Sequence, residues 1–149
     1  MNQSDFAVLL ADTTKRIVGD IEWVEDEDHS PSVEFRAEVV SDPGYPLLLK
    51  GSYNVLAGAL SYTLVHRGSG RIYALDMGKD HHNPDCNYVG EKHKHKWREP
   101  VRDKEAYAPP DITAPVTDPL AVWQQFCLEA NLVHQGVMHA PPAIQQVII

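Results

Sequence analysis

The residues best suited to chemistry gather at positions 76–99, in the stretch DMGKDHHNPDCNYVGEKHKHKWRE, which holds four of the eight histidines of the chain. Its second half, HKHKWRE, is predicted to be a strand. Because side chains of a strand alternate between two faces, His93 and His95 point one way and Lys94 and Lys96 the other. Two imidazoles at this spacing suit two ligands of one zinc, iron or manganese ion.

Further ligands are expected from the connection that precedes this strand. If RIYALDM pairs antiparallel with HKHKW, the loop of residues 78–92 begins and ends at the same end of the sheet, near His93. A bound ion that keeps one position for water lowers the pKa of that water, so the expected reaction class is hydrolysis. The candidate metal ligands are His93, His95, His82, His81, Asp76 and Asp85.

A purely structural interpretation competes with the metal site. A neutral histidine has one hydrogen-bond donor and one acceptor, so a half-buried ring on a strand can satisfy itself with backbone or carboxylate groups. His93 and His95 would then be ordinary polar members of the protein interior.

Two resemblances to known families appear in the same stretch. His93, His95 and Glu99 form H-x-H-x-x-x-E, which resembles the first metal motif of the cupin barrels. Asn87 stands where that family has a glycine, and a second motif is absent, so the barrel and its oxygenase activity are not transferred. The order LD…HHNP…H-x-H is similar to a small family of uncharacterised bacterial and mobile-element domains, which implies that the central half forms one unit and brings no activity.

Basic residues are concentrated next to the histidines. Six of the 13 lysines and arginines lie within residues 92–104. We expect Lys94, Lys96 and Arg98 to face water or an anionic partner, and together with Arg71 they are the candidate anion-binding or partner surface. A formal net charge of -8 argues against general affinity for nucleic acid, so only the 92–104 stripe is considered for it.

Two alternative functions remain open. The first is a non-enzymatic protein-interaction module, in which the acidic run at 25–28 and the basic stripe steer a protein partner or a second copy into a homo-oligomer. The second is a metal-free ribonuclease that uses a histidine as general acid or base. Because the stripe lies opposite His93 and His95, only His81 or His82 could work beside its lysines. The sequence leaves open whether the protein is an enzyme.

The elements that must position these residues predict an α+β fold. Apolar residues follow a helical period from residue 4 to 17, with Gly19 as the stop, and a period of two from residue 21 onward. About six strands joined by short turns favour an antiparallel meander. Asp118 and Pro119 begin a second helix, which is expected to pack on the sheet. Residues 1–149 form one expected domain, with residues 137–149 as a flexible or partner-docked tail.

Composition places the protein among soluble globular domains. No apolar run approaches the roughly 20 residues that a membrane span requires. The first residues, MNQSDF, lack the basic and apolar regions of a secretory signal, and two cysteines make no disulfide framework. We therefore expect a cytoplasmic protein without a membrane partner.

Overall fold

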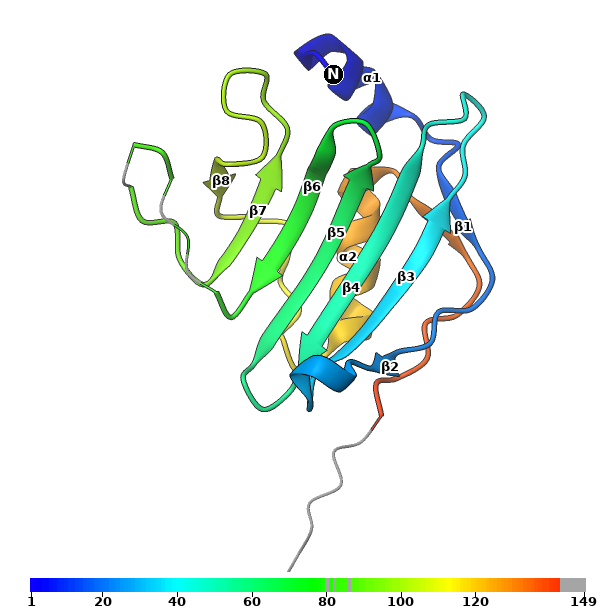
Figure 1. Cartoon of the computed structure of the whole chain (residues 1–149), viewed down its shortest axis with the longest axis vertical. Helices are drawn as coiled ribbons and strands as arrows, with labels where there is room; N and C mark the ends of the chain where they lie inside the picture. The colour runs from blue at the N-terminus through cyan, green and yellow to red at the C-terminus, as the bar shows by residue number, and fades with distance from the viewer. Residues whose placement is uncertain (80, 82, 86, 143–149) are drawn as a thin grey trace, which may run out of the picture.

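A seven-stranded antiparallel sheet with the order β2-β3-β4-β5-β6-β7-β8 is the centre of the computed structural model, which describes residues 1–79, 81, 83–85 and 87–142 (Figure 1). Strand order equals chain order, which confirms the predicted α+β meander, with one strand more than the six expected. The strands are β2 (Val24–Glu25), β3 (Val33–Val39), β4 (Leu47–Asn54), β5 (Ala59–His66), β6 (Gly70–Met77), β7 (Lys92–Lys96) and β8 (Ala106–Tyr107). A short 3-10 helix, η1 (Glu27–His29), lies in the turn between β2 and β3.

The N-terminal helix α1 (Gln3–Ala11) is shorter than its apolar period suggests. It ends at Asp12, whose carboxylate accepts hydrogen bonds from the backbone N–H and hydroxyl of Thr14. The fully buried Lys15 then donates its ammonium hydrogens to three carbonyl oxygens at the end of the helix. These local side-chain bonds satisfy the helix end, so the predicted stop at Gly19 is wrong.

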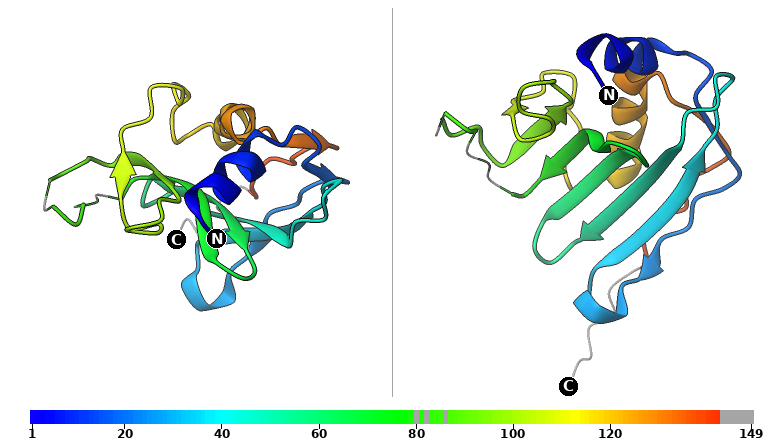
Figure 2. Two further views of the ribbon diagram at one scale, coloured as in Figure 1. Left: turned by 90° about the horizontal axis from the view of Figure 1, so that it is seen from above. Right: turned by 45° about the horizontal axis from the view of Figure 1, so that its top comes forward.

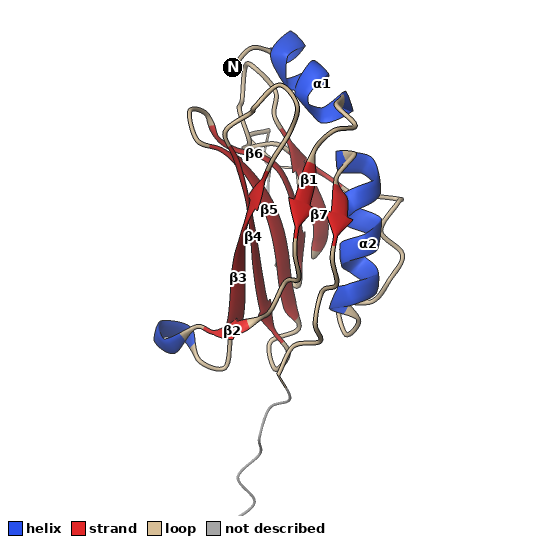
Figure 3. Ribbon diagram, turned by 90° about the vertical axis from the view of Figure 1, so that its right-hand side faces the viewer, coloured by secondary structure: helices blue, strands red, loops and turns tan. Residues whose placement is uncertain are grey.

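The C-terminal helix α2 (Pro119–Ala130) covers one face of the sheet (Figure 3). It begins as predicted, with the Asp118 side chain accepting from the backbone N–H of Ala121. Phe126 packs against two aromatic rings of the sheet, with centroid distances of 5.7 Å to Tyr62 and 5.0 Å to Tyr73. The apolar core therefore lies between α2 and this face. The other side of the sheet, opposite α2, is called the far face below.

Register aligns side chains of successive strands in rows across the far face. One row contains Glu34, Ser52, Ser61, Asp76 and His93. The next row contains Arg36, Lys50, Thr63, Ala74 and His95. The predicted histidine strand thus extends a polar surface that begins at β3.

A second, two-stranded parallel sheet joins the two ends of the chain. Here β1 (Arg16–Val18) pairs with β9 (Val133–Gln135), and the pairing continues as a bridge between Ile21 and Met138. The strand predicted to begin at Ile21 therefore begins only at Val24. Residues 137–139 bond to the backbone and side chain of residues 20–21, whereas residues 143–149 of the expected tail lie outside the described part.

The connection between β6 and β7 lies on the β7 side of the sheet, far from β3 (Figure 2). Gly78 begins it with a positive φ of 82°, and a Cβ there would come within 2.1 Å of the Gly58 carbonyl oxygen. Only glycine tolerates both conditions, so the chain can leave the sheet sharply at this point. Among the described residues, none of the helices has the length and apolar character needed to cross a bilayer.

Candidate metal centre

Strand β7 carries two histidines on the far face, as the alternation predicts. His93 and His95 are 2% and 1% exposed, and their ring centroids are 5.1 Å apart. Loops that flank β7 cover this part of the far face, so both rings are removed from solvent. A buried, closely spaced imidazole pair requires a partner for every ring nitrogen.

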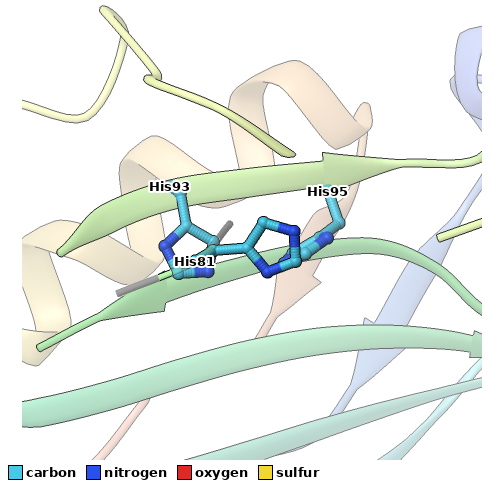
Figure 4. A group of neighbouring side chains, drawn as sticks. All are labelled: His81, His93 and His95. Carbon is cyan, nitrogen blue, oxygen red and sulfur yellow. The ribbon is translucent and has the colours of Figure 1, made fainter. Parts of the chain in front are cut away.

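A third histidine reaches the pair from the β6–β7 connection. The Asn83 side chain exchanges two hydrogen bonds with the backbone of Ala106, and His81 Nε2 donates to the Lys104 carbonyl oxygen at 2.8 Å. These bonds fold the loop back over β7, where the rings of the three histidines are turned toward one another (Figure 4). One ligand atom from each of the rings of His81, His93 and His95 lies within 4.8 Å of the other two.

Asp76 completes the cluster from the neighbouring strand. It stands directly opposite His93 in the β6–β7 register. Its Oδ2 lies 3.3 Å from His93 Nε2 and 3.5 Å from His95 Nε2. Its Oδ1 accepts a hydrogen bond of 2.7 Å from the hydroxyl of Ser61, which fixes the carboxylate plane. The structure thus brings one carboxylate oxygen to both buried imidazoles.

Hydrogen bonds to the backbone define which nitrogen of each ring carries the proton. His93 Nδ1 donates to the Gly90 carbonyl oxygen at 3.0 Å, and His95 Nδ1 donates to the Asp103 carbonyl oxygen at 2.7 Å. A carbonyl oxygen can only accept, so both protons lie on Nδ1 in the neutral rings. The lone pairs of both Nε2 atoms are therefore directed at Asp76. In this tautomer each Nε2 is free to bind a metal while Nδ1 is held by a carbonyl, as is common among metal-binding histidines.

The electrostatics of the cluster favour an ionised carboxylate and a neutral His81. Burial alone would raise the pKa of Asp76, but His93 and His95, whenever each ring carries a second proton on Nε2, and the Ser61 hydroxyl hold it far below its usual range. Burial lowers the pKa of His81, and the nearby His95, His93 and Arg71 lower it further, against the bond to the Lys104 carbonyl. Ionised carboxylates and neutral imidazoles are the forms that coordinate metals.

The family of the chain follows from a comparison with models of protein families. One such model matches residues 1–132, which is most of the chain. The chain belongs to a family of unknown function, DUF6978. This membership confirms the expectation of a small uncharacterised domain family. No curated protein and no solved structure matches the chain.

All residues of the histidine cluster fall within the part that matches DUF6978, whereas β9 and the residues after it fall outside. Sequence reasoning placed His93, His95, His81 and Asp76 in one candidate set, and the structure brings these four together. It missed Ser61, which enters through the β5–β6 register. The sequence indicates the pairing of β5 with β6 only through the tight turn GSG at residues 68–70, and this pairing places Ser61 opposite Asp76.

One other described candidate, Asp85, does not join the cluster. Asp85 accepts two hydrogen bonds from Asn87 and caps its own turn. His82 lies outside the described residues. Glu99, the last residue of the cupin-like motif, accepts from the backbone of Gln3 and so ties the chain to α1.

The expectation that Lys94 faces water is wrong. Lys94 is fully buried beneath α2, where its ammonium group contacts Asp111 at 2.5 Å and Glu129 at 3.0 Å. Lys96 Nζ contacts the other oxygen of Glu129 at 2.9 Å. The anionic partners of this lysine row are therefore carboxylates of the same chain. They were not foreseen because they lie 17 and 35 residues away from Lys94.

The predicted basic stripe is thus divided between different surroundings. Lys94 and Lys96 lie on the α2 side, Arg98 forms an exposed pair with Glu105, and Arg71 lies beside Asp76 on the far face. A metal-free site that uses Lys94 together with His93 is incompatible with this arrangement, because the sheet separates them.

Proposed function

We propose that the domain binds one divalent transition-metal ion through His93, His95 and Asp76, with His81 as a fourth ligand. The single observation that carries the proposal is the contact of both Nε2 atoms with Asp76 Oδ2, at 3.3 and 3.5 Å, while both Nδ1 atoms donate elsewhere. Lone pairs that face one another at this distance repel unless a cation lies between them.

Protons could supply that positive charge, but at a high cost. Both imidazoles would have to be charged while 2% and 1% exposed, with ring centroids only 5.1 Å apart. The guanidinium group of Arg71 lies 3.7 Å from the same Asp76 oxygen. Two positively charged rings this close to each other and to the Arg71 guanidinium group repel one another. One metal ion places the positive charge at the point where the lone pairs converge.

The distances also fit the coordination of zinc. Bonds of about 2.0–2.1 Å from a tetrahedral Zn²⁺ place two ligand atoms about 3.3–3.4 Å apart. The two contacts of Asp76 Oδ2 have nearly this length. His81 donates Nε2 to Lys104, so its Nδ1 is the free acceptor, and the 4.8 Å spread of the three histidine ligand atoms requires a small inward movement. Three imidazoles and a carboxylate suit Zn²⁺, and Fe²⁺ and Mn²⁺ accept the same donor types.

Hydrolysis is the reaction class that such an ion supports. Four protein ligands fill a tetrahedral ion, so a water would need a fifth position or the place of His81, and the ion would then lower the pKa of that water toward neutrality. The residues of the chain would hold and orient the site. Ser61 keeps Asp76 turned toward the histidines, and the carbonyls of Gly90 and Asp103 keep the Nε2 lone pairs directed inward.

The test is metal analysis and Zn²⁺ titration calorimetry on untagged protein. We expect the wild type to bind one ion per chain, and the double variant His93→Ala, His95→Ala to bind none. The matched control is His29→Ala, His66→Ala, which removes two histidines outside the cluster. Circular dichroism establishes that each variant is folded. A wild type that takes up no ion, or a double variant that retains it, would disprove the proposal.

A further inference from the structure

The histidine cluster is open to solvent on the side of Arg71. His93 and His95 are almost completely covered. In contrast, the Asp76 side chain is 13% exposed, and those of Arg71 and Asp103 are 30% and 32% exposed. A ligand that reaches Asp76 from solvent therefore lies beside a guanidinium group.

Arg71 is held beside the cluster with donor capacity left over. Its Nε donates to Asp103 Oδ2 at 2.8 Å, and its Nη2 reaches the Asp103 carbonyl oxygen at 3.4 Å. Its Nη1 approaches Asp76 Oδ2 only to 3.7 Å, which is too long for a hydrogen bond. Since a guanidinium has five N–H donors, the edge that faces the cluster can still serve an incoming acceptor.

The far face carries further positive charge in line with the cluster. Arg36 and Lys50 stand directly opposite each other on β3 and β4, in the row that ends at His95. Like charges in this position destabilise a sheet. In the described part of the chain neither cation forms an ion pair, although Glu34 and Glu38 lie on the same strand as Arg36. Thr63 separates Lys50 from β6 and adds a hydroxyl group.

We propose that the metal-loaded site binds a phosphoryl oxyanion, with one oxygen on the ion, at a fifth position or in the place of His81, and a second oxygen on Arg71. This inference rests on the proposed metal site. A divalent ion together with Arg71 outweighs the charge of Asp76 and Asp103, so the loaded site is positive and attracts an anion. The edge of Arg71 that Asp103 leaves free can donate a charge-assisted hydrogen bond to one phosphate oxygen in a fixed direction, whereas a lysine presents a point charge. Arg36 and Lys50 extend the favourable field along the same face.

The test is calorimetric titration of inorganic phosphate into protein that was loaded with zinc and freed of excess metal. Arg71→Gln should bind phosphate roughly 10- to 100-fold more weakly than wild type, because it loses a charge-assisted bond. Arg71→Lys should be intermediate. The control is Arg67→Gln, which removes an exposed arginine paired with Glu38, and it should leave phosphate affinity unchanged. Zinc content is measured for every sample.

The two proposals fail in distinguishable ways. If the wild type retains no zinc, the metal site itself is disproved. If zinc is retained but phosphate binds equally well to metal-free protein or to Arg71→Gln, only the oxyanion site is overturned. Acetate that binds as tightly as phosphate would also overturn it. If Arg71→Gln loses its zinc, the phosphate affinity of Arg71→Lys is compared with that of wild type instead, because this variant keeps a positive charge beside Asp76 but lacks the guanidinium group. An affinity equal to that of wild type would overturn the oxyanion site.

Discussion

Glu129 is predicted to contribute strongly to folding stability at neutral pH. Its Oε1 accepts hydrogen bonds from the hydroxyls of Tyr73 and Tyr107 and from Lys94, and its Oε2 accepts from Lys96. Burial raises the pKa of Glu129, but these donors outweigh it, with the Tyr73 hydroxyl foremost, and lower the pKa to about 2. We expect Glu129→Gln, which keeps the shape and removes the charge, to destabilise the fold.

The size of the effect follows from this pKa. The drop from 4.5 to about 2 corresponds to roughly 3 kcal/mol at about 1.4 kcal/mol per pKa unit. The Glu129 side chain is 31% exposed, so solvent screening reduces the expected loss to about 2 kcal/mol. The neutral amide would also leave the buried Lys94 ammonium with Asp111 as its remaining carboxylate partner.

The sign of the pH dependence is defined by the same shift. A carboxylate whose pKa is lower in the folded state stabilises the fold above its unfolded pKa, and this contribution disappears as the pH falls through the folded pKa. The difference in the free energy of unfolding between wild type and Glu129→Gln should therefore be largest at pH 7 and should shrink as the pH falls from 4.5 to about 2. The variant lacks this titration.

Urea unfolding at several pH values measures both the destabilisation by Glu129→Gln and its dependence on pH. The matched control is Glu105→Gln, which breaks an exposed pair with Arg98 and should cost less than about 1 kcal/mol. If Glu129→Gln costs no more than this control, or if its cost is the same at pH 7 and pH 3, then Glu129 is not an ionised centre of the network.

Three further outcomes are expected. Lys15→Met should lower the free energy of unfolding by about 2 kcal/mol, measured by urea titration, because it leaves carbonyl oxygens at the end of α1 without their buried donor. Ser61→Ala should weaken Zn²⁺ binding roughly 10- to 100-fold in calorimetry, because Asp76 loses the bond that orients it. Zn²⁺ at about 100 times its Kd should stabilise the wild type by about 2.7 kcal/mol, raise its Tm by roughly 5–10 °C, and lose this effect with EDTA.

Local patterns predicted the parts of the fold that depend on local physics. Alternation along β7 correctly separated His93 and His95 from Lys94 and Lys96, because the side-chain period of a strand is independent of what covers it. The Asp118 cap correctly placed the start of α2. The same reasoning misjudged the surroundings of Lys94, since an alternating lysine row is typical of a solvated face and the burying carboxylates come from distant segments.

Long-range pairing was the main feature that local patterns could not reveal. The strands β1 and β9 each have three residues, and their first residues, Arg16 and Val133, are far apart in the chain. Such short strands show no period that would predict a partner. In the candidate site, His81 was foreseen because its loop must return to β7, whereas Asp85 was a candidate only by proximity in sequence and uses its carboxylate in its own turn.

The two polar clusters on opposite faces of β7 have connected roles. A metal site needs ligands on a rigid element, because small displacements of a ligand weaken coordination. The bonds of Lys94 and Lys96 to Glu129 hold β7 against α2, and the adjacent residues His93 and His95 are thereby held in place on the far face. If the lysine network provides this support, Glu129→Gln should reduce Zn²⁺ affinity as well as stability, although Glu129 itself lies on the other side of the sheet. Unchanged Zn²⁺ affinity in the folded variant would show that β7 is positioned by its pairing with β6 alone.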